Sequence, residues 1–300
     1  MKKNIIKCPD KKGHTVSDGI EIYYETFGKP ENPAVLLING MDDLCTSWYA
    51  GFCNPIIETG YYIIRFDNRD CGLSTWIDSW EKDVPYTIED MAGDAVALLD
   101  ALNIKNAHVI GASMGGMIAQ RIAIDYPERV STLTSISSSA HFLDTECSPV
   151  ILSGSINNTA PLEEKYPGYQ TDYGQAVEYR MEAFGLFVGS RFQMDEELIR
   201  AILDDNIRNR NGYNPVANLH QSTAIMTSGS RLDELSKISA PTLIIHETED
   251  PLLHHDHSVK CADLIPGAKL LLLDGVGHEI PPGIIPEGHN AVLELFLKNN

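Results

Sequence analysis

Short, continuously apolar runs alternate along this chain with longer segments of helical periodicity. The runs occupy residues 34–40, 61–67, 108–113, 131–137, 241–247 and 268–275. Between the second and the third run, apolar side chains recur with the 3.6-residue period of a helix, at Ile88, Met91, Ala95, Leu98, Leu99 and Leu102. Strands that are apolar on both faces are typical of a parallel sheet covered by helices on both sides. The alternation therefore predicts an α/β fold around a mostly parallel sheet.

The alternation stops between residues 140 and 229. Helix-like patterns there include residues 173–189 and 195–209, and no convincing strand is found. We therefore expect a core domain made of residues 1–139 and 230–300, with a helical cap (lid) inserted at residues 140–229.

Two local patterns predict where elements turn or begin. Residues 13–28 form two strand-like runs around Asp18-Gly19, which predicts a hairpin. Thr87, followed three residues later by Asp90, fits an acidic variant of the capping box and predicts a helix start.

The chain is acidic, with a formal net charge of −19 over 300 residues. Such a surface repels phosphate backbones and anionic lipids, so we expect no nucleic-acid or membrane partner. No apolar run approaches the ~18–20 residues of a membrane span. The N-terminal stretch has only Ile5-Ile6 as an apolar core, which is too short for a signal peptide, and we expect a cytoplasmic location. The oligomeric state stays open.

The spacing of cysteine and histidine does not indicate a metal site. The six cysteines show no C-x-x-C spacing, which argues against a zinc site and a disulfide scaffold. Residues 254–257 read His-His-Asp-His, and a solvated helix start with Asp256 as its cap accounts for them without a metal. We expect neither a metal nor another cofactor.

Residues 111–115, Gly-Ala-Ser-Met-Gly, fit the pattern G-x-S-x-G between a predicted strand and a predicted helix. Small residues around Ser113 allow a sharp turn that exposes its hydroxyl, and the N-terminus of the following helix favours developing negative charge. A serine hydroxyl is a weak nucleophile and needs a neighbouring base. Ser113 is therefore a candidate nucleophile whose base and acid must come from elsewhere in the chain.

The base and the acid are expected just beyond other strands, because ligands of α/β sheets bind at the carboxyl ends of the strands. His278 follows the last predicted strand, in a glycine-containing loop that can reach the serine. As a base it predicts activity that rises through one ionisation near neutrality. Asp250 follows the preceding strand and can hold the imidazole in the required tautomer. Glu247 and Glu249 compete for the acid role, and we choose Asp250 because it directly precedes a proline.

Two backbone N–H groups are candidate donors to an oxyanion. One belongs to Met114, the residue after the serine. The other belongs to Met41, in the turn that follows the apolar run at 34–40.

Together these segments resemble the α/β-hydrolase-fold serine hydrolases. The matching motifs are "DNRDCGLST" at 67–75, "GASMGG" at 111–116, "YPERVSTL" at 126–133, "PTLIIHETEDP" at 241–251 and "GVGHEI" at 275–280. The candidate residues also follow the family's order Ser…Asp…His. Among the members, the chain is most similar to the aclacinomycin methylesterase-like esterases, through "RFDNRDCGLST" and an oxyanion strand without the usual histidine.

The resemblance implies an α/β-hydrolase fold with an eight-stranded, mostly parallel sheet, flanking helices and a helical cap. It implies a catalytic triad of Ser113, Asp250 and His278. The N–H groups of Met41 and Met114 would form the oxyanion hole. The implied reaction is cleavage of a carboxylic ester through an acyl-enzyme intermediate, without a cofactor.

The chain departs from the family pattern beside the oxyanion strand. It has Asn39-Gly40 where many members have His-Gly, and Asp42-Asp43 where a proline often follows. Two carboxylates there would oppose an anionic substrate, and the net charge acts in the same direction. The cap offers apolar side chains to cover a hydrophobic group, namely Phe142, Met181, Phe184, Phe187 and Phe192. We therefore expect a small-molecule ester that is neutral or cationic and partly apolar.

Two other classes of function stay open. The same residues suit other cofactor-free chemistry, such as carbon–carbon bond hydrolysis or perhydrolysis. A small-molecule receptor on this fold would bind in the pocket without useful turnover, and the intact set of catalytic residues argues against it. Haloalkane dehalogenases and epoxide hydrolases are disfavoured, because they need an aspartate where Ser113 stands.

Overall fold

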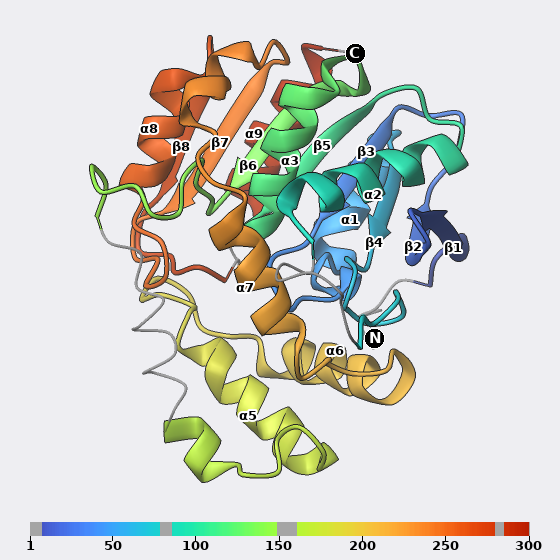
Figure 1. The fold of residues 1–300 in the computed structure, drawn as a ribbon, viewed down its shortest axis with the longest axis vertical. Helices are drawn as coiled ribbons and strands as arrows, with labels where there is room; N and C mark the ends of the chain where they lie inside the picture. The colour runs from blue at the N-terminus through green and yellow to red at the C-terminus, as the bar shows by residue number, and fades with distance from the viewer. Residues whose placement is uncertain (1–7, 79–85, 149–160, 280–284, 300) are drawn as a thin grey trace.

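The computed structural model describes residues 8–78, 86–148, 161–279 and 285–299. Its centre is an eight-stranded sheet in the order β1-β2-β4-β3-β5-β6-β7-β8 (Figure 1). The strands are β1 (Lys11–Ser17), β2 (Ile20–Phe27), β3 (Ala34–Ile38), β4 (Tyr62–Phe66), β5 (Ala107–Ala112), β6 (Val130–Ile136), β7 (Thr242–Glu247) and β8 (Lys269–Leu273). The strands from β4 to β8 in this order run parallel to their neighbours, whereas β2 pairs antiparallel with β1 and β4. The predicted mostly parallel, eight-stranded sheet is confirmed.

The hairpin at the start of the chain turns where the sequence predicts it. Ser17 pairs with Ile20, so Asp18 and Gly19 form a two-residue turn between β1 and β2. Both residues have positive φ, 47° and 81°, as a tight hairpin turn of type I′ requires. Aspartate and glycine adopt this backbone conformation more readily than most residues do, which explains why the dipeptide stands there.

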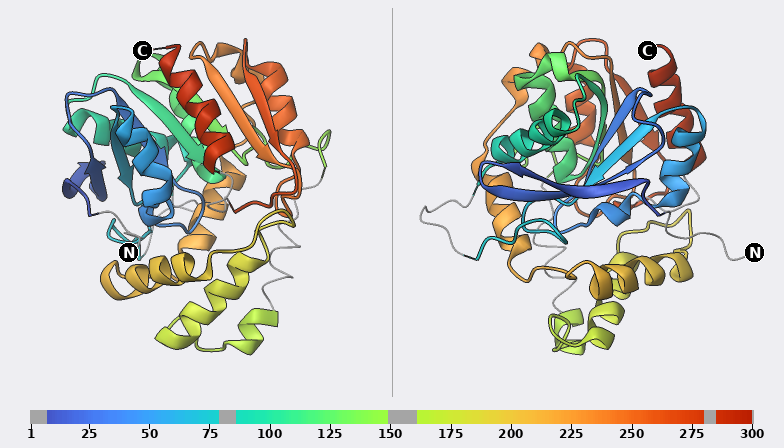
Figure 2. Two further views of the ribbon diagram at one scale, coloured as in Figure 1. Left: turned by 180° about the vertical axis from the view of Figure 1, so that it is seen from behind. Right: turned by 90° about the vertical axis from the view of Figure 1, so that its right-hand side faces the viewer.

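Helices cover both faces of the sheet, because each parallel strand sends alternate side chains to opposite sides. Leu36 and Ile38 of β3 join one apolar cluster, and Val35 and Leu37 join the other. The first face is covered by α2 (Ile88–Ala101), α3 (Met114–Asp125) and α8 (Asp256–Leu264), and the second by α1 (Ala50–Glu58) and α9 (Ile285–Leu297) (Figures 1 and 2). Within the described ranges, no helix has the length and apolar character needed to cross a bilayer.

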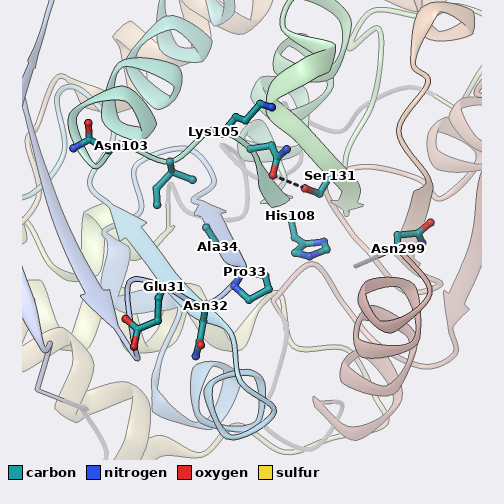
Figure 3. Close-up of a pocket in the computed structure, with 11 residues that line it drawn as sticks. Glu31, Asn32, Pro33, Ala34, Asn103, Lys105, His108, Ser131 and Asn299 are labelled. Atoms are coloured by element: carbon teal, nitrogen blue, oxygen red, sulfur yellow. Dashed lines mark hydrogen bonds between the residues drawn. The ribbon is translucent and has the colours of Figure 1, made fainter.

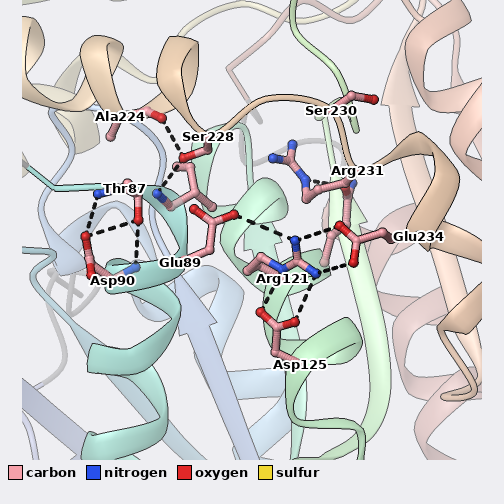
Figure 4. A network of polar contacts seen from close by, with 12 residues as sticks. Thr87, Glu89, Asp90, Arg121, Asp125, Ala224, Ser228, Ser230, Arg231 and Glu234 are labelled. Carbon is pink, nitrogen blue, oxygen red and sulfur yellow. Dashed lines mark hydrogen bonds and ion pairs between the residues drawn. The ribbon is translucent and has the colours of Figure 1, made fainter. Parts of the chain in front are cut away.

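The capping box predicted at the start of α2 is present. The Thr87 side chain accepts a hydrogen bond from the Asp90 N–H at 3.2 Å, and the Asp90 carboxylate accepts one from the Thr87 N–H at 2.8 Å (Figure 4). These two bonds satisfy backbone donors that lack a partner within the helix. The sequence signal for this helix start is therefore confirmed.

A buried arginine joins the helices on the same face. Arg121 of α3 forms ion pairs with Asp125 at 2.8 Å, with Glu234 at 3.0 Å and with Glu89 at 3.7 Å (Figure 4). These partners belong to α3 itself, to the 3-10 helix η3 (Leu232–Lys237) and to α2. The Arg121 side chain is only 8% exposed, so the charge is paired where water is scarce, as a buried guanidinium requires.

A helical segment is inserted between β6 and β7, and we call its described residues, 140–148 and 161–229, the inserted segment. It contains α5 (Tyr173–Gly185), α6 (Glu196–Asn209) and α7 (Ala217–Thr227), and its described part holds no strand. The helices α5 and α6 lie beyond the end of the sheet at which the strands point (Figures 1 and 2). Arg231, which is 2% exposed, joins the two ends of the segment through bonds to Ala140 and Ser139 at 2.9 Å each.

Two further 3-10 helices, η1 (Cys45–Ser47) and η2 (Pro127–Arg129), lie in loops of the core. The first of them contacts the inserted segment, because Thr46 donates a hydrogen bond to Asn206 of α6 at 2.5 Å. Both of these side chains are 1% exposed. The loop after β3 is thus attached to the inserted helices.

Candidate active site

Ser113 stands on a strained turn between β5 and α3. Its φ of 53° and ψ of −120° are unusual for a residue with a side chain. The turn requires glycine on both sides: a Cβ at Gly111 would lie 2.0 Å from the carbonyl oxygen of Gly115, and one at Gly115 would lie 2.2 Å from that of Ile38. Strain of this kind persists where the surrounding structure holds it, and it exposes the serine at the end of the sheet. The half-buried Ser113 is therefore placed as a nucleophile would be.

His278 and Asp250 meet beyond the ends of β8 and β7. The His278 Nδ1 lies 2.6 Å from the Asp250 Oδ2. The other carboxylate oxygen, Oδ1, accepts the N–H groups of Leu252 at 2.8 Å and Leu253 at 2.9 Å. The side chain of Asp250 is fully buried and that of His278 is 12% exposed. The imidazole is thus held with its Nδ1 toward the acid and its Nε2 available for proton transfer.

The pKa values of this pair move in opposite directions. Burial alone would raise the pKa of Asp250, but the charge of His278 and the hydrogen bonds from His246 and His278 hold it below its ordinary range. Burial alone would lower the pKa of His278, but the charge of Asp250 and its hydrogen bond, with further carboxyl groups nearby, raise it to about 9. We therefore expect the ionisation of the base at a higher pH than the near-neutral value expected from the sequence.

The two competing acids are committed to other partners. Glu247 at the end of β7 is buried, and its Oε2 accepts a hydrogen bond from Ser137 at 2.5 Å. Burial raises the pKa of the Glu247 carboxyl, so the charged form is disfavoured. Glu249 accepts the N–H of Ser190 at 2.8 Å and its hydroxyl at 2.7 Å. The geometry therefore favours Asp250 as the partner of His278.

The nucleophile and the base are not hydrogen-bonded in this structure. Among the residues that the structure describes, no hydrogen bond joins Ser113 to His278. The strands that precede them, β5 and β8, point to the same end of the sheet, with β6 and β7 between them. Bonds of this kind are often long without substrate and tighten when it binds.

The two candidate oxyanion donors flank Ser113. A Cβ at Gly40 would lie 3.3 Å from the Ser113 Cβ, so the turn that leads to Met41 passes directly beside the nucleophile. Met114 is the first residue of α3, and its N–H has no acceptor within the helix. Met114 thus adjoins the serine in the chain, and Met41 directly follows a residue that contacts it, so both are suitably placed candidates for an oxyanion hole.

The turn after Met41 is held by the inserted segment. The Asp42 N–H donates to the Gln221 Oε1 of α7 at 2.7 Å. The Asp42 carboxylate pairs with Arg180 of α5 at 3.0 Å, and that guanidinium lies 3.2 Å from the centre of the Tyr213 ring. The expectation that the Asp42 carboxylate opposes an anionic substrate did not include this cation, which lies 138 residues along the chain and pairs with the carboxylate.

The neighbouring Asp43 and the residue after the base, Glu279, are both half-buried. Burial raises the pKa of Asp43, and burial together with the charge of Asp43 raises that of Glu279. Both carboxyl groups therefore favour the neutral form more than exposed acids do. The negative charge near the oxyanion donors is smaller than the sequence suggests.

The apolar residues chosen from the sequence are spread over the molecule. Met181 is 4% exposed and packs inside the inserted segment, with Phe184 against the same cluster. Phe142 packs against the core cluster on the α2 and α3 face, and Phe192 against the cluster on the opposite face. These four side chains take part in the packing of the molecule.

Phe187 lies against the loop that carries the base. Its carbonyl oxygen accepts the N–H of Glu279 at 3.0 Å. A Cβ at Gly277 would come within 2.1 Å of the same oxygen, so glycine is required there. The inserted segment thus contacts the His278 loop as well as the Met41 turn.

Three residues around the site escaped the sequence analysis: His246, Arg180 and Gln221. His246 is a fully buried histidine that directly follows three apolar residues of β7, and this contrast was a usable signal. Arg180 and Gln221 stand on helices whose distance from Met41 in sequence hides the contact.

The His-His-Asp-His stretch is organised by protein contacts. The predicted cap at Asp256 is wrong: α8 begins at this residue, His255 precedes it as the N-cap, and the Asp256 carboxylate instead accepts the Ser148 N–H at 2.8 Å. Asp256 and His257 also approach Cys147 closely enough to share an ion. Both ring nitrogens of His257 are engaged, however, with Ser139 and with the Ser148 carbonyl at 3.0 Å each.

A separate hollow of about 530 Å³ lies at the opposite end of the sheet (Figure 3). It is lined at the starts of β3, β5 and β6 by residues that include Ala34, His108 and Ser131. The candidate nucleophile follows the other end of β5, so this hollow does not belong to the site.

Comparison with known proteins gives relatives for nearly the whole chain. A family model described as the α/β hydrolase fold matches residues 33–160. The rhodomycin D methylesterase of Streptomyces peucetius is 30% identical, over 88% of this chain and 91% of that protein. An esterase structure from Rhodococcus has a TM-score of 0.73 at 19% identity, over 95% of this chain and 99% of that chain. The enol-lactonase structure from Burkholderia xenovorans has a TM-score of 0.69 at 20% identity, over 95% and 98%.

The two solved structures, at such low identity, show the fold alone. The methylesterase relative adds sequence likeness along nearly the full length, in the branch of the family that the motifs predicted. The sheet order and the strained serine turn agree with this assignment. The chain therefore belongs to the α/β-hydrolase fold family.

Proposed function

We propose that this protein is a serine hydrolase that cleaves a carboxylic ester of a small molecule through an acyl-enzyme intermediate. Ser113 is the nucleophile, His278 the general base and Asp250 the acid that orients it. The observation that carries the proposal is the 2.6 Å contact between His278 and Asp250, at the same end of the sheet as the strained serine turn. The methylesterase relatives support an ester as the substrate.

The reaction has two half-reactions. The Ser113 Oγ attacks the ester carbonyl while the His278 Nε2 takes its proton, and the N–H groups of Met41 and Met114 stabilise the oxyanion. His278 then protonates the leaving alcohol, and the C–O bond of the ester breaks. Water, deprotonated by the same imidazole, attacks the acyl-enzyme, and collapse of the second tetrahedral intermediate releases the acid and restores Ser113.

Residues 140–229 form the cap of this enzyme in our proposal. The attachment of this segment to the Met41 turn and to the His278 loop supports that role. The substrate is neutral or cationic and partly apolar, because the whole chain carries a net charge of −19. Phe187 is the strongest candidate for a contact with it, because its carbonyl bonds the Glu279 N–H, next to the base.

The proposal is tested with the pair of wild type and Ser113→Ala. We expect the wild type to hydrolyse p-nitrophenyl or methyl esters in steady state and to be labelled at Ser113 by a fluorophosphonate. The alanine variant should fold, resist labelling and lose about 10⁴-fold or more in kcat. Labelling at another residue, or unchanged turnover in the variant, would remove Ser113 from this role.

A further inference from the structure

A second histidine shares the carboxylate that orients the base. His246 lies in β7 with no exposed surface, and its Nε2 is 3.2 Å from the Asp250 Oδ2. The same carboxylate oxygen is 2.6 Å from the His278 Nδ1. Asp250 Oδ2 thus lies between two imidazoles, of which the proposed reaction uses one.

The surroundings of His246 determine which nitrogen carries a proton. Its Nε2 faces two acceptors, the Asp250 carboxylate and the Leu253 carbonyl at 2.8 Å, and neither can donate a hydrogen bond. The Nε2 of His246 therefore carries a hydrogen and donates it. The proton on Nε2 follows from the hydrogen-bond partners, since an unprotonated Nε2 would face two lone-pair groups.

The other side of the ring leads to the nucleophile. The His246 Nδ1 lies 2.6 Å from the Ser258 Oγ, which is 3.0 Å from the Ser138 carbonyl. The Ser138 hydroxyl in turn donates to the Ser113 carbonyl at 2.8 Å. A continuous line of buried polar contacts thus joins the acid to the backbone of the serine turn.

We propose that His246 is a positioning residue for the triad, which holds Asp250 toward His278 and weakens the pull of that carboxylate on the proton of the base. The inference rests on the proposed serine hydrolase function. A donor on Asp250 Oδ2 withdraws part of the negative charge that stabilises the imidazolium form of His278. Without this donor the base would hold its proton more tightly, and a larger part of it would be inactive at neutral pH.

The need for such a donor follows from the carboxyl groups around the base. His278 is faced by Asp250 and Glu247 from the β7 side, by Glu279 from its own loop and by Asp43 from the turn after β3. All four favour a protonated imidazole when they are charged. His246, for its part, is faced by Asp250, by Glu247 and by His255, and it bonds directly to the strongest of the four partners of the base.

Substitution of His246 by either of two neutral amides tests the roles of its two ring nitrogens separately. In His246→Gln the amide nitrogen can take the place of Nε2 and keep a donor to Asp250. In His246→Asn the amide can reach the Ser258 side in place of Nδ1, and Asp250 loses its donor. We expect the midpoint of the pH profile of kcat/KM to rise by about half a unit to one unit in the asparagine variant, and to stay within about 0.3 unit in the glutamine variant.

His257→Gln is the matched control, because this buried ring also bonds a serine hydroxyl and a carbonyl without touching the triad. It should keep the wild-type midpoint whatever its melting temperature. Equal midpoints in the asparagine and glutamine variants, or a lower midpoint in the asparagine variant, would overturn the inference. A wild type without Ser113-dependent turnover would instead overturn the proposed function, so the two failures are distinguishable.

Discussion

The two sides of the candidate nucleophile are held by different parts of the chain. On the side of β6 and β7, Asp250 is bound by the N–H groups of its own loop and by His246, all within the α/β core. On the side of β3, the turn at Met41 is bound by Gln221 and, through Asp42, by Arg180, which belong to the inserted helices. The candidate acid is thus held by the core alone, whereas the Met41 turn is held by the inserted segment, which also contacts the His278 loop through the Phe187 carbonyl.

On the core side, we expect the largest loss of activity from a substitution of Asp250. Asp250→Asn should keep the geometry and lower kcat by about 10⁴-fold, because an amide favours the wrong imidazole tautomer and cannot stabilise the imidazolium. Steady-state kinetics with an ester substrate measures the loss. Glu249→Gln is the control in the same loop and should stay within about twofold. The opposite order of effects would show that Glu249 is the acid.

The pH dependence of kcat/KM tests the role of His278 on the core side. The pKa of His278 is raised to about 9, and only the neutral imidazole acts as a base. The neutral fraction grows as pH rises, so kcat/KM should increase through about pH 9, with a gain of roughly a hundredfold over its value at pH 7. A pH series on the wild type, restricted to conditions in which the protein stays folded, measures the profile. A plateau already reached at pH 7 would contradict it.

On the side of the Met41 turn, we expect the largest loss of activity from a substitution of Gln221. This fully buried side chain accepts the Asp42 N–H, so Gln221→Leu leaves that donor without a partner and releases the turn. We expect kcat to fall by about 10- to 100-fold with KM changed less than about threefold, and the pH midpoint to stay at the wild-type value. Thr223→Val, at a half-buried position of the same helix whose hydroxyl donates to the Leu219 carbonyl, is the control. A shifted pH midpoint in Gln221→Leu would mean that the two sides are not separate.

The smallest expected effect concerns Arg180. Arg180→Met leaves the Asp42 carboxylate unpaired beside the proposed oxyanion donors, and kcat should fall by about tenfold. The preference for neutral over carboxylate-bearing esters should grow at the same time, more at low salt than at high salt. Arg200→Met removes an exposed ion pair of the inserted segment with Glu178 and should leave both quantities nearly unchanged. Equal effects of the two substitutions would show that Arg180 acts only through the stability of the inserted segment and has no specific effect on the oxyanion donors.

The sequence by itself determined the local features and the order of the elements. The Asp18-Gly19 turn, the capping box at Thr87 and the serine turn at Ser113 depend on residues that are neighbours in the chain, so local sterics and hydrogen bonding decide them. The fold class followed from apolar strands alternating with helices, because this pattern leaves few ways to bury both faces of a sheet. Asp250 and His278 could be named because each lies in the loop that follows a strand of that sheet.

The tertiary structure alone decided the environment of these residues. The pairing of Asp42 depends on Arg180, and the proton on the His246 Nε2 depends on two acceptors in the loop that follows β7. The Asp256 carboxylate at the start of α8 likewise accepts a hydrogen bond from Ser148 in another loop. Such pairs are far apart in sequence, and no local pattern specifies which of many polar side chains will meet once the core is packed. The sequence therefore identified the candidate reacting groups, whereas their partners were decided only when distant segments were brought together.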